Sequence, residues 1–349
     1  MRLDRVGETA LLDWIRKAAL EKDKRKFLRE NKKEKILLGI GDDAAAFRLS
    51  PGKTALASSD MMVEGVHFDT AYFTPYQLGF KIVSVNASDI FAMGGSPLMA
   101  VFSLAAPPEM EAGFIKRIFE GALDALAFYG ARLGGGDLSA SPPGVKKEFL
   151  VLDMCMIGEA GRIVKRSGAR VGDGLFVTGP LGDSACGLAL LKKMGGPIPL
   201  ENEKMKNGEV TKVGRGLPWE AARPLLVRHL MPCAKRPPRR PPAAMIDVSD
   251  GLLLDASRLC RESGVGVKIY EDRIPVSAEM RRAAAALGLS PLDLAKSGGE
   301  DYELLYTARR NAGGDGILIG EVIPSGLFMV DATGKMKRFK PEGYKHFQE

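Results

Sequence analysis

Apolar residues recur at helical spacing near the start of the chain. Leu11, Leu12, Ile15 and Ala19 would share one face of a helix within residues 1–35. Four later segments show the same periodicity or end at glycine, as helices commonly do. These segments are residues 75–93, 109–130, 182–196 and 280–288.

Short apolar runs between these segments predict strands. They cover residues 54–60, 62–68, 99–107, 148–158, 174–179, 265–274, 317–323 and 326–330. In addition, residues 244–264 read as strand, acidic turn and helix, and residues 297–307 as a glycine turn that enters a strand. Alternation of strands and helices in both halves predicts an α+β protein of two α/β domains. We place them at residues 1–158 and 159–349.

Acidic residues gather beside glycine and serine at the boundaries of these elements. The clusters are GIGDDAAAF (39–47), SSD (58–60), NASD (86–89), GGGD (134–137) and DVSD (247–250). Adjacent carboxylates repel one another unless a cation or a hydrogen-bond donor lies between them. Mg²⁺ prefers oxygen ligands and commonly bridges carboxylates to substrate phosphates. The clusters together predict a site for metal and phosphate.

Each cluster also has a purely structural interpretation. DVSD could be a helix N-cap, GGGD and GDD could be turns, and NASD could be a satisfied polar pair in a core. Five such clusters in one chain are harder to explain as five unrelated turns, so we favour the shared site.

Composition limits the function further. The 349 residues are 45% hydrophobic and 27% charged, and no apolar run approaches the ~20 residues of a membrane helix. The net charge of +7 comes partly from residues 22–35 and 235–240, which we interpret as solvated basic segments and not as a nucleic-acid site. The four cysteines form no CxxC pair and indicate reduced thiols in a cytoplasmic protein.

The common nucleotide-binding motifs are absent. The chain has no GxxxxGK[ST] loop and no GxGxxG after a strand. Its three histidines form no evident catalytic pair with serine or cysteine. We therefore expect chemistry based on carboxylates, metal and backbone N–H groups.

The order and spacing of eight blocks resemble those of the thiamine-monophosphate kinase family. The blocks are GIGDDAAAF, SSDMMVEGVHF, VNASDIFAMGGSP, GGGD, KRSGARVGD, GDSACGLALL, IDVSDGLLLD and SGGEDYELLYT. That family belongs to the superfamily of aminoimidazole ribonucleotide synthetase and selenophosphate synthetase. The resemblance implies ATP- and Mg²⁺-dependent phosphorylation of thiamine monophosphate to thiamine diphosphate by direct in-line transfer. Such a reaction depends mainly on positioning and charge neutralisation.

The resemblance also assigns roles to individual residues. The expected ligands of several Mg²⁺ ions are Asp42, Ser58, Ser59, Asp60, Asp89, Asp137, Asp247 and Asp250. ATP is expected at Gly136, Asp137, Arg166 and Ser249, and thiamine monophosphate at His67, Glu300 and Tyr344. Asp43 and Asp301 are given supporting roles only.

The resemblance further implies a homodimer whose N-terminal domains pair into a β-barrel. The C-terminal domain would be a mixed sheet with helices on one side, and it would complete the nucleotide and substrate site. Leu138 departs from the family pattern because threonine is usual there, so a hydroxyl beside Asp137 is lost.

Two alternatives stay open at the level of sequence. The chain could be another ATP-dependent synthetase of the superfamily, although the SGGEDYEL block and Tyr344 favour the kinase. It could also be a nucleotide-binding regulatory protein without turnover, although the full set of matched aspartates favours an enzyme.

Overall fold

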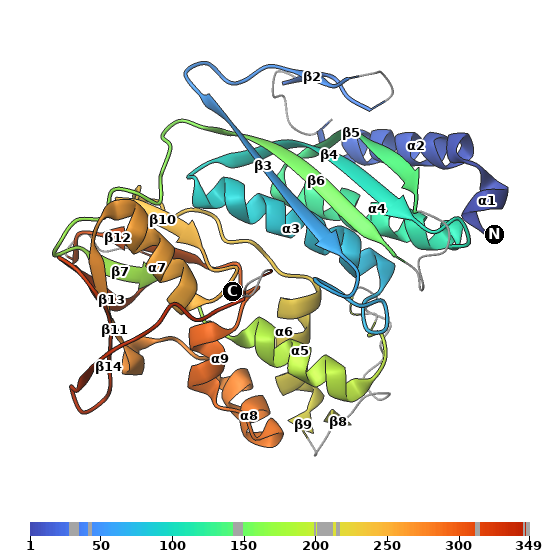
Figure 1. The fold of residues 1–349 in the computed structure, drawn as a ribbon. Helices are drawn as coiled ribbons and strands as arrows, with labels where there is room; N and C mark the ends of the chain where they lie inside the picture. Colours follow the sequence, from blue (N-terminus) through green and yellow to red (C-terminus); the bar gives the residue numbers. More distant parts are fainter. Residues whose placement is uncertain are drawn as a thin grey trace. The chain divides into compact units, whose positions relative to one another are not determined.

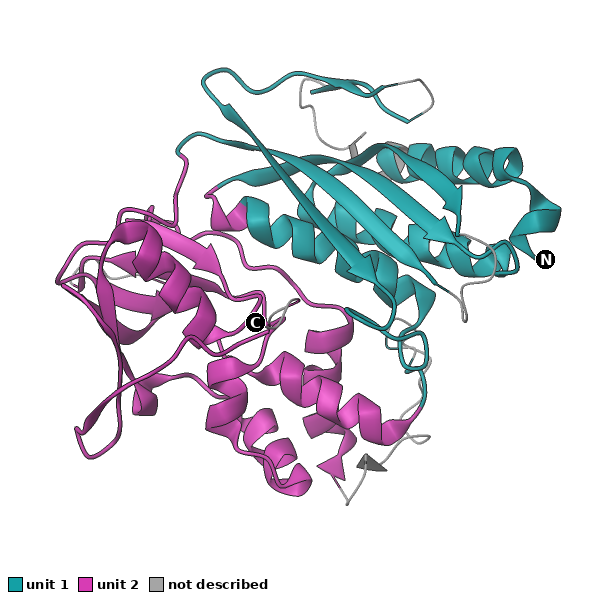
Figure 2. Ribbon diagram, viewed as in Figure 1, with its two compact units in different colours: residues 1–90, 95–162, 196–202 teal, residues 91–94, 163–195, 203–349 magenta. Residues whose placement is uncertain are grey.

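The chain folds into two compact units in a computed structural model (Figures 1 and 2). Unit 1 comprises residues 1–90, 95–162 and 196–202, and unit 2 comprises residues 91–94, 163–195 and 203–349. The structure describes residues 1–27, 35–40, 44–141, 149–198, 200, 212–213, 217–310, 315–344 and 346.

Unit 1 is built on a four-stranded sheet with the strand order β3-β6-β4-β5. Its strands are β3 (Thr54–Val63), β4 (Ser96–Ala106), β5 (Arg132–Ala140) and β6 (Val151–Ala160). β4 and β5 are parallel, and the other two pairings are antiparallel. A separate two-stranded ribbon joins β1 (Ile36–Leu38) to β2 (Ala46–Phe47).

The alternation of side chains along β6 separates the two faces of this sheet. Leu152, Met154 and Met156 are fully buried on one face, whereas the residues between them are partly exposed. Helices α3 (Pro75–Ala92) and α4 (Ala112–Tyr129) lie on the buried face (Figure 1). The opposite face of the sheet keeps partial exposure along its length.

The N-terminal segment forms two helices where the sequence predicts one. α1 (Leu3–Val6) and α2 (Glu8–Phe27) are separated at Gly7, whose φ of 77° lies in the left-handed region that favours glycine. Leu11, Ile15 and Ala19 are buried as predicted. The prediction was wrong for Leu12, which lies about 100° around the helix from Leu11 and is 39% exposed.

The GGGD cluster is part of strand β5 and not the turn that its composition suggested. Gly135, Gly136 and Asp137 pair with β4 in a parallel ladder. A side chain at Gly136 would overlap the carbonyl oxygen of Phe102 on the neighbouring strand. Close approach of two backbones therefore explains a glycine run inside a strand.

Unit 2 contains a seven-stranded mixed sheet in the order β10-β12-β7-β13-β11-β14-β15. The strands are β7 (Gly174–Val177), β10 (Ala244–Asp247), β11 (Gly266–Tyr270), β12 (Leu304–Ala308), β13 (Ile317–Ile323), β14 (Leu327–Val330) and β15 (Met336–Arg338). The helices are α5 (Asp183–Met194), α6 (Trp219–Leu230), α7 (Leu252–Ser263), the 3-10 turn η1 (Glu271–Arg273), α8 (Ala278–Leu287) and α9 (Pro291–Ser297). A short pair joins β8 (Lys212–Val213) to β9 (Leu217–Pro218).

The sheet of unit 2 carries an apolar core. Phe176 on β7 stacks on Tyr306 of β12 with ring centroids 5.4 Å apart, and Met245 on β10 packs in the same cluster. The prediction of two α+β domains is thus confirmed at the level of two mixed-sheet units.

The structure also bears on membrane-spanning helices and on the cysteines. Among the helices that it describes, none is both long enough and apolar enough to cross a membrane. Cys155, Cys186, Cys233 and Cys260 are all free thiols, as the sequence predicts.

A glycine contact between α3 and α4 gives a test of the packing. A methyl group at Gly121 of α4 would overlap the carbonyl oxygen of Tyr76 on α3. We expect Gly121→Ala to lower the free energy of unfolding by about 1–3 kcal/mol, measured by urea denaturation.

Gly113→Ala is the matched control, because Gly113 lies on the same helix and a Cβ added there would have no neighbouring atom within 4 Å. It should be neutral or stabilise by up to about 1 kcal/mol, since alanine is the better helix former. Equal effects of the two substitutions would contradict the close packing of α3 on α4.

Candidate active site

Strand β3 and helix α3 bring together part of the predicted metal set. Ser58 and Asp60 lie on the same face of β3 as the buried Met62, whereas Ser59 lies on the opposite face. The Ser58 hydroxyl donates to the carbonyl oxygen of Asn86 on α3 at 3.4 Å. The inner face of β3 and the polar part of α3 are therefore in contact.

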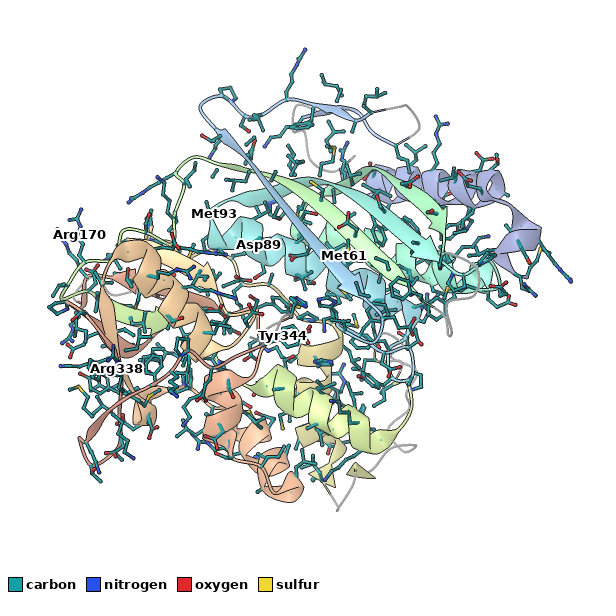
Figure 3. All side chains as sticks on the ribbon, viewed as in Figure 1. Met61, Asp89, Met93, Arg170, Arg338 and Tyr344 are labelled. Atoms are coloured by element: carbon teal, nitrogen blue, oxygen red, sulfur yellow. The ribbon has the colours of Figure 1, made fainter. Side chains whose placement is uncertain are left out.

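Asp89 occupies the next turn of α3, three residues after Asn86, and is partly exposed (Figure 3). This placement fits a shared role with Ser58 and Asp60. Ser59 could contribute to the same ion only through its backbone carbonyl, because its side chain lies on the other face of the sheet. Asp42 and Asp43, from the cluster at 39–47, lie outside the described residues.

Asp137 lies at the other edge of the same sheet. It pairs with Ser103 on β4, while Asp60 pairs with Met154 on β6. Two strands separate β3 from β5, so the edges are three strand spacings of about 4.8 Å apart, or about 14 Å. Asp60 and Asp137 of one sheet therefore cannot bind the same ion.

His67 is held by the turn that follows β3. Its Nδ1 accepts a hydrogen bond from the backbone N–H of Val63 at 3.0 Å. Because Nδ1 is an acceptor here, the proton of the neutral ring lies on Nε2. His67 can therefore offer an N–H donor at Nε2 to a ligand.

In unit 2, the DVSD cluster forms the connection from β10 to α7. Asp247 ends β10 and is only 4% exposed, and α7 begins at Leu252. Neither Ser249 nor Asp250 caps the helix with its side chain. The simple N-cap interpretation of this cluster is therefore wrong.

Asp255, which the sequence pattern did not single out, supplies the side chain that binds the N–H groups of this turn. One of its carboxylate oxygens accepts the backbone N–H groups of Ser249, Asp250 and Gly251 at 3.1, 3.0 and 3.2 Å. Burial raises the pKa of Asp255 to about 7, and the negative charge of Asp247 adds to the shift. The sequence feature that could have identified Asp255 is its position in the first turn of the predicted helix.

Arg258 supplies positive charge to this turn. Its Nη1 lies 2.5 Å from a carboxylate oxygen of Asp250 and 2.7 Å from one of Asp255. The guanidinium thus holds together two carboxylates that would otherwise repel each other. The geometry keeps Asp250 in a fixed position at the start of α7.

The DVSD turn is paired by backbone hydrogen bonds with the SGGEDYEL segment. The N–H of Glu300 donates to the carbonyl of Ser249 at 2.7 Å, and that of Tyr302 to the carbonyl of Val248 at 2.9 Å. Glu300 and Tyr302 have φ values of 63° and 52°, which non-glycine residues rarely adopt. A side chain at Gly299 would lie 2.6 Å from the carbonyl oxygen of Ser249, so the pairing requires glycine there.

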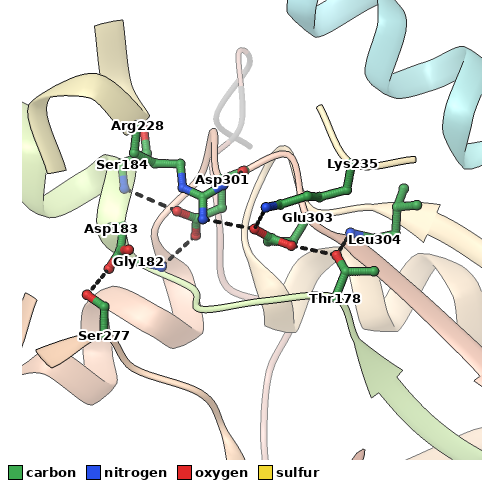
Figure 4. A network of polar contacts seen from close by, with 10 residues as sticks. All are labelled: Thr178, Gly182, Asp183, Ser184, Arg228, Lys235, Ser277, Asp301, Glu303 and Leu304. Atoms are coloured by element: carbon green, nitrogen blue, oxygen red, sulfur yellow. Dashed lines mark hydrogen bonds and ion pairs between the residues drawn. The ribbon is translucent and has the colours of Figure 1, made fainter. Parts of the chain in front are cut away.

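Asp301, which is part of this segment, is fully buried (Figure 4). Its carboxylate accepts the N–H of Gly182 at 2.5 Å and that of Ser184 at 3.1 Å, at the start of α5. Burial raises the pKa of Asp301 to about 7, although these two donors favour the charged form. The supporting role predicted for Asp301 is consistent with these contacts.

Glu303 is the second fully buried acid of the segment (Figure 4). Arg228 lies 2.9 Å and Lys235 3.4 Å from its Oε1, and the Thr178 hydroxyl donates to its Oε2 at 2.5 Å. The same hydroxyl accepts the N–H of Leu304 at 2.8 Å. Paired charges and a shared hydroxyl therefore anchor the segment where it enters β12.

Two further predicted residues lie near the DVSD turn or its helix. Tyr344 is 44% exposed, and its N–H donates to the carbonyl of Asp250 at 3.0 Å (Figure 3). Arg166 is exposed, and its carbonyl accepts the hydroxyl of Ser263 at the end of α7 at 3.0 Å. Unit 2 therefore arranges Asp247, Ser249, Asp250, Glu300 and Tyr344 around one pair of loops.

The donors present in both units fit Mg²⁺. They are carboxylate and hydroxyl oxygens, the ligands that this ion prefers. Negative charge accumulates at Asp247, Asp250 and Asp255, and the neighbouring acid raises the pKa of Asp255. Among the described residues no three acids, histidines or cysteines are already gathered as a metal site.

Comparison with known families agrees with this architecture. The family "AIR synthase related protein, N-terminal domain" matches residues 41–160, and the corresponding C-terminal domain family matches residues 170–318. A hydrogenase maturation protein, HypE of E. coli, shares the fold with 19% identity and a TM-score of 0.61 over 95% of this chain and 98% of its own.

Individual relatives indicate a narrower family than these domain matches do. The thiamine-monophosphate kinase of Aquifex aeolicus is 35% identical over 99% of this chain and all of its own length. That of Bacillus subtilis is 34% identical over 77% of each chain. A solved structure of AaThiL complexed with AMPPCP and TMP covers 99% of both chains with 32% identity and a TM-score of 0.70. The chain therefore belongs to the thiamine-monophosphate kinase family.

Proposed function

We propose that this chain transfers the terminal phosphoryl group of ATP to the phosphate of thiamine monophosphate, which yields thiamine diphosphate and ADP. The observation that carries this proposal is the likeness to thiamine-monophosphate kinases along 99% of the chain. The paired DVSD and SGGEDYEL loops support it, because they order the expected metal and acceptor residues in one place. The two domains, residues 1–158 and 159–349, would each supply part of the machinery in the cytoplasm.

Positioning and charge neutralisation would carry the reaction. When bound, Mg²⁺ would neutralise the phosphates and the developing charge of the transferred group. The proposed ligands are Asp42, Ser58, Ser59, Asp60, Asp89, Asp137, Asp247 and Asp250. Gly136, Asp137, Arg166 and Ser249 would hold ATP, with the exposed Arg166 guanidinium suited to a phosphate.

The acceptor would be held by three side chains of different chemistry. His67 would donate from Nε2, and Glu300 would accept from an N–H of the ligand. The exposed ring of Tyr344 offers an electron-rich face to the thiazolium cation of the thiamine group. No protein nucleophile is needed for direct transfer between two phosphates.

We further propose a homodimer in which the exposed sheet face of unit 1 is covered and its edge strands pair with those of the second copy. The exposed face carries apolar side chains that a monomer would leave in water, and Met61 alone is 52% exposed (Figure 3). The edges β3 and β5 carry Asp60 and Asp137 about 14 Å apart. Pairing β3 of one copy with β5 of the other would bring these two carboxylates together and close the sheets into a barrel.

The direct test of the function is an assay of purified protein with ATP, Mg²⁺ and thiamine monophosphate. Thiamine diphosphate and ADP should form in equal amounts, and product formation should stop when a chelator removes the metal. ADP release with a different phosphate acceptor, and none with thiamine monophosphate, would favour another enzyme of the superfamily.

Asp89→Asn tests the metal assignment. The loss of one carboxylate charge should lower kcat by about 10³-fold or more, because charge neutralisation carries the reaction. The circular dichroism spectrum and melting temperature should stay close to those of the wild type. Glu262→Gln, which neutralises an exposed acid on α7, should keep full activity. Near-wild-type turnover by Asp89→Asn would remove this residue from the metal set.

Mixing two inactive variants tests the shared sheet edges. Asp60→Asn and Asp137→Asn should each be inactive alone. After the two are unfolded and refolded together, half of the dimers are mixed and each holds one intact pair of carboxylates, so about a quarter of wild-type activity should return. Mixed dimers without activity would show that the two residues act within one copy of the chain.

A further inference from the structure

The end of helix α6 is in contact with the loop that carries Glu300. Arg228 and His229 are adjacent on this helix, and His229 is only 3% exposed. Neither residue was selected from the sequence, and neither is among the proposed metal, ATP or acceptor residues. Their contacts nevertheless reach three residues of the SGGEDYEL segment.

His229 contacts the side chain of Glu300 directly. Its Nδ1 lies 3.3 Å from Oε2 of Glu300 and 3.1 Å from the hydroxyl oxygen of Ser184 at the start of α5. The Ser184 hydroxyl is the nearer of the two oxygens and bonds to Nδ1. A carboxylate can only accept hydrogen bonds, so the tautomer with its proton on Nδ1 is the one that can donate to Glu300.

Arg228 contacts the same loop at the two residues Asp301 and Glu303. Its Nη1 donates to the carbonyl of Asp301 at 3.3 Å, and its Nη2 pairs with Glu303 at 2.9 Å (Figure 4). The loop is thereby tied to the scaffold immediately after Glu300. Arg228 fixes the backbone, whereas His229 reaches the Glu300 carboxylate itself.

The backbone of the loop needs such support. Glu300 has a φ of 63°, a conformation that persists in non-glycine residues only when surrounding contacts impose it. The Glu300 side chain is 29% exposed, so one part of it remains open to a ligand while Oε2 faces a buried ring. A side chain with this exposure would otherwise sample several rotamers.

We propose that His229 is a positioning residue for the acceptor site: its Nδ1–H orients the carboxylate of Glu300 toward the bound thiamine phosphate. The inference rests on the proposed function only in the identity of that ligand. The orientation of Glu300 is a property of unit 2 alone, so it can be measured without turnover.

Three variants separate positioning from general stability. His229→Leu keeps a buried side chain of similar size and removes the donor. His229→Asn places an amide N–H close to the position of Nδ1 and should restore the bond. Arg223→Ala changes an exposed residue of the same helix and serves as the control.

Hydrogen exchange of the full-length protein without ligand gives the first measurement. The reporting amides are those of Glu300 and Tyr302, which donate to the neighbouring DVSD turn. We expect both to exchange about tenfold faster in His229→Leu and at the wild-type rate in Arg223→Ala, because the loop opens locally more often. His229→Asn should lie close to the wild type.

Steady-state kinetics give the second measurement. In His229→Leu the KM for thiamine monophosphate should rise about tenfold while kcat and the KM for ATP change less than about twofold, since a binding contact alone is lost. Wild-type exchange and wild-type KM in His229→Leu would overturn the proposal, as would His229→Asn behaving like His229→Leu. If the wild type does not phosphorylate thiamine monophosphate, the proposed function fails, and exchange at Glu300 and Tyr302 alone decides the role of His229.

Discussion

The hydrogen bonds between the DVSD turn and the SGGEDYEL segment are the constraint on which the candidate site of unit 2 depends. The N–H of Val248 donates to the carbonyl of Glu303 at 2.7 Å, and the N–H groups of Glu300 and Tyr302 donate back to the turn. The backbone of Tyr344 joins the same turn at Asp250. Three segments far apart in sequence thus form one hydrogen-bonded surface, which carries residues that we propose for metal, nucleotide and acceptor.

The chain places acids together by giving each buried carboxylate its own donors. Asp255 takes three backbone N–H groups, Asp301 takes two, and Glu303 takes Arg228 with the Thr178 hydroxyl. Buried charges without such partners would be strongly destabilising. The partly exposed Asp250 is held by Arg258 in the same way, so the turn keeps its shape around several acids.

Local sequence pattern predicted the mixed α/β elements, the buried stripe of Leu11, Ile15 and Ala19, and the acidic turns. It could not predict the strand character of GGGD, because that depends on contact with β4, a distant strand. It missed Asp255 and His229 for the same reason, since their roles come from partners that folding brings close. The alternation of β3 separates Ser59 from Ser58 and Asp60, a distinction that composition alone does not reveal.

The proposed reaction is direct transfer between two phosphates on a carboxylate and metal framework. The most direct measurement is a rapid-quench experiment with ATP labelled in its terminal phosphate and with thiamine monophosphate. Direct transfer predicts that label passes from ATP to the terminal phosphate of thiamine diphosphate, with no labelled protein at any time. Label on the protein before product forms, or label released only as free phosphate, would contradict direct transfer.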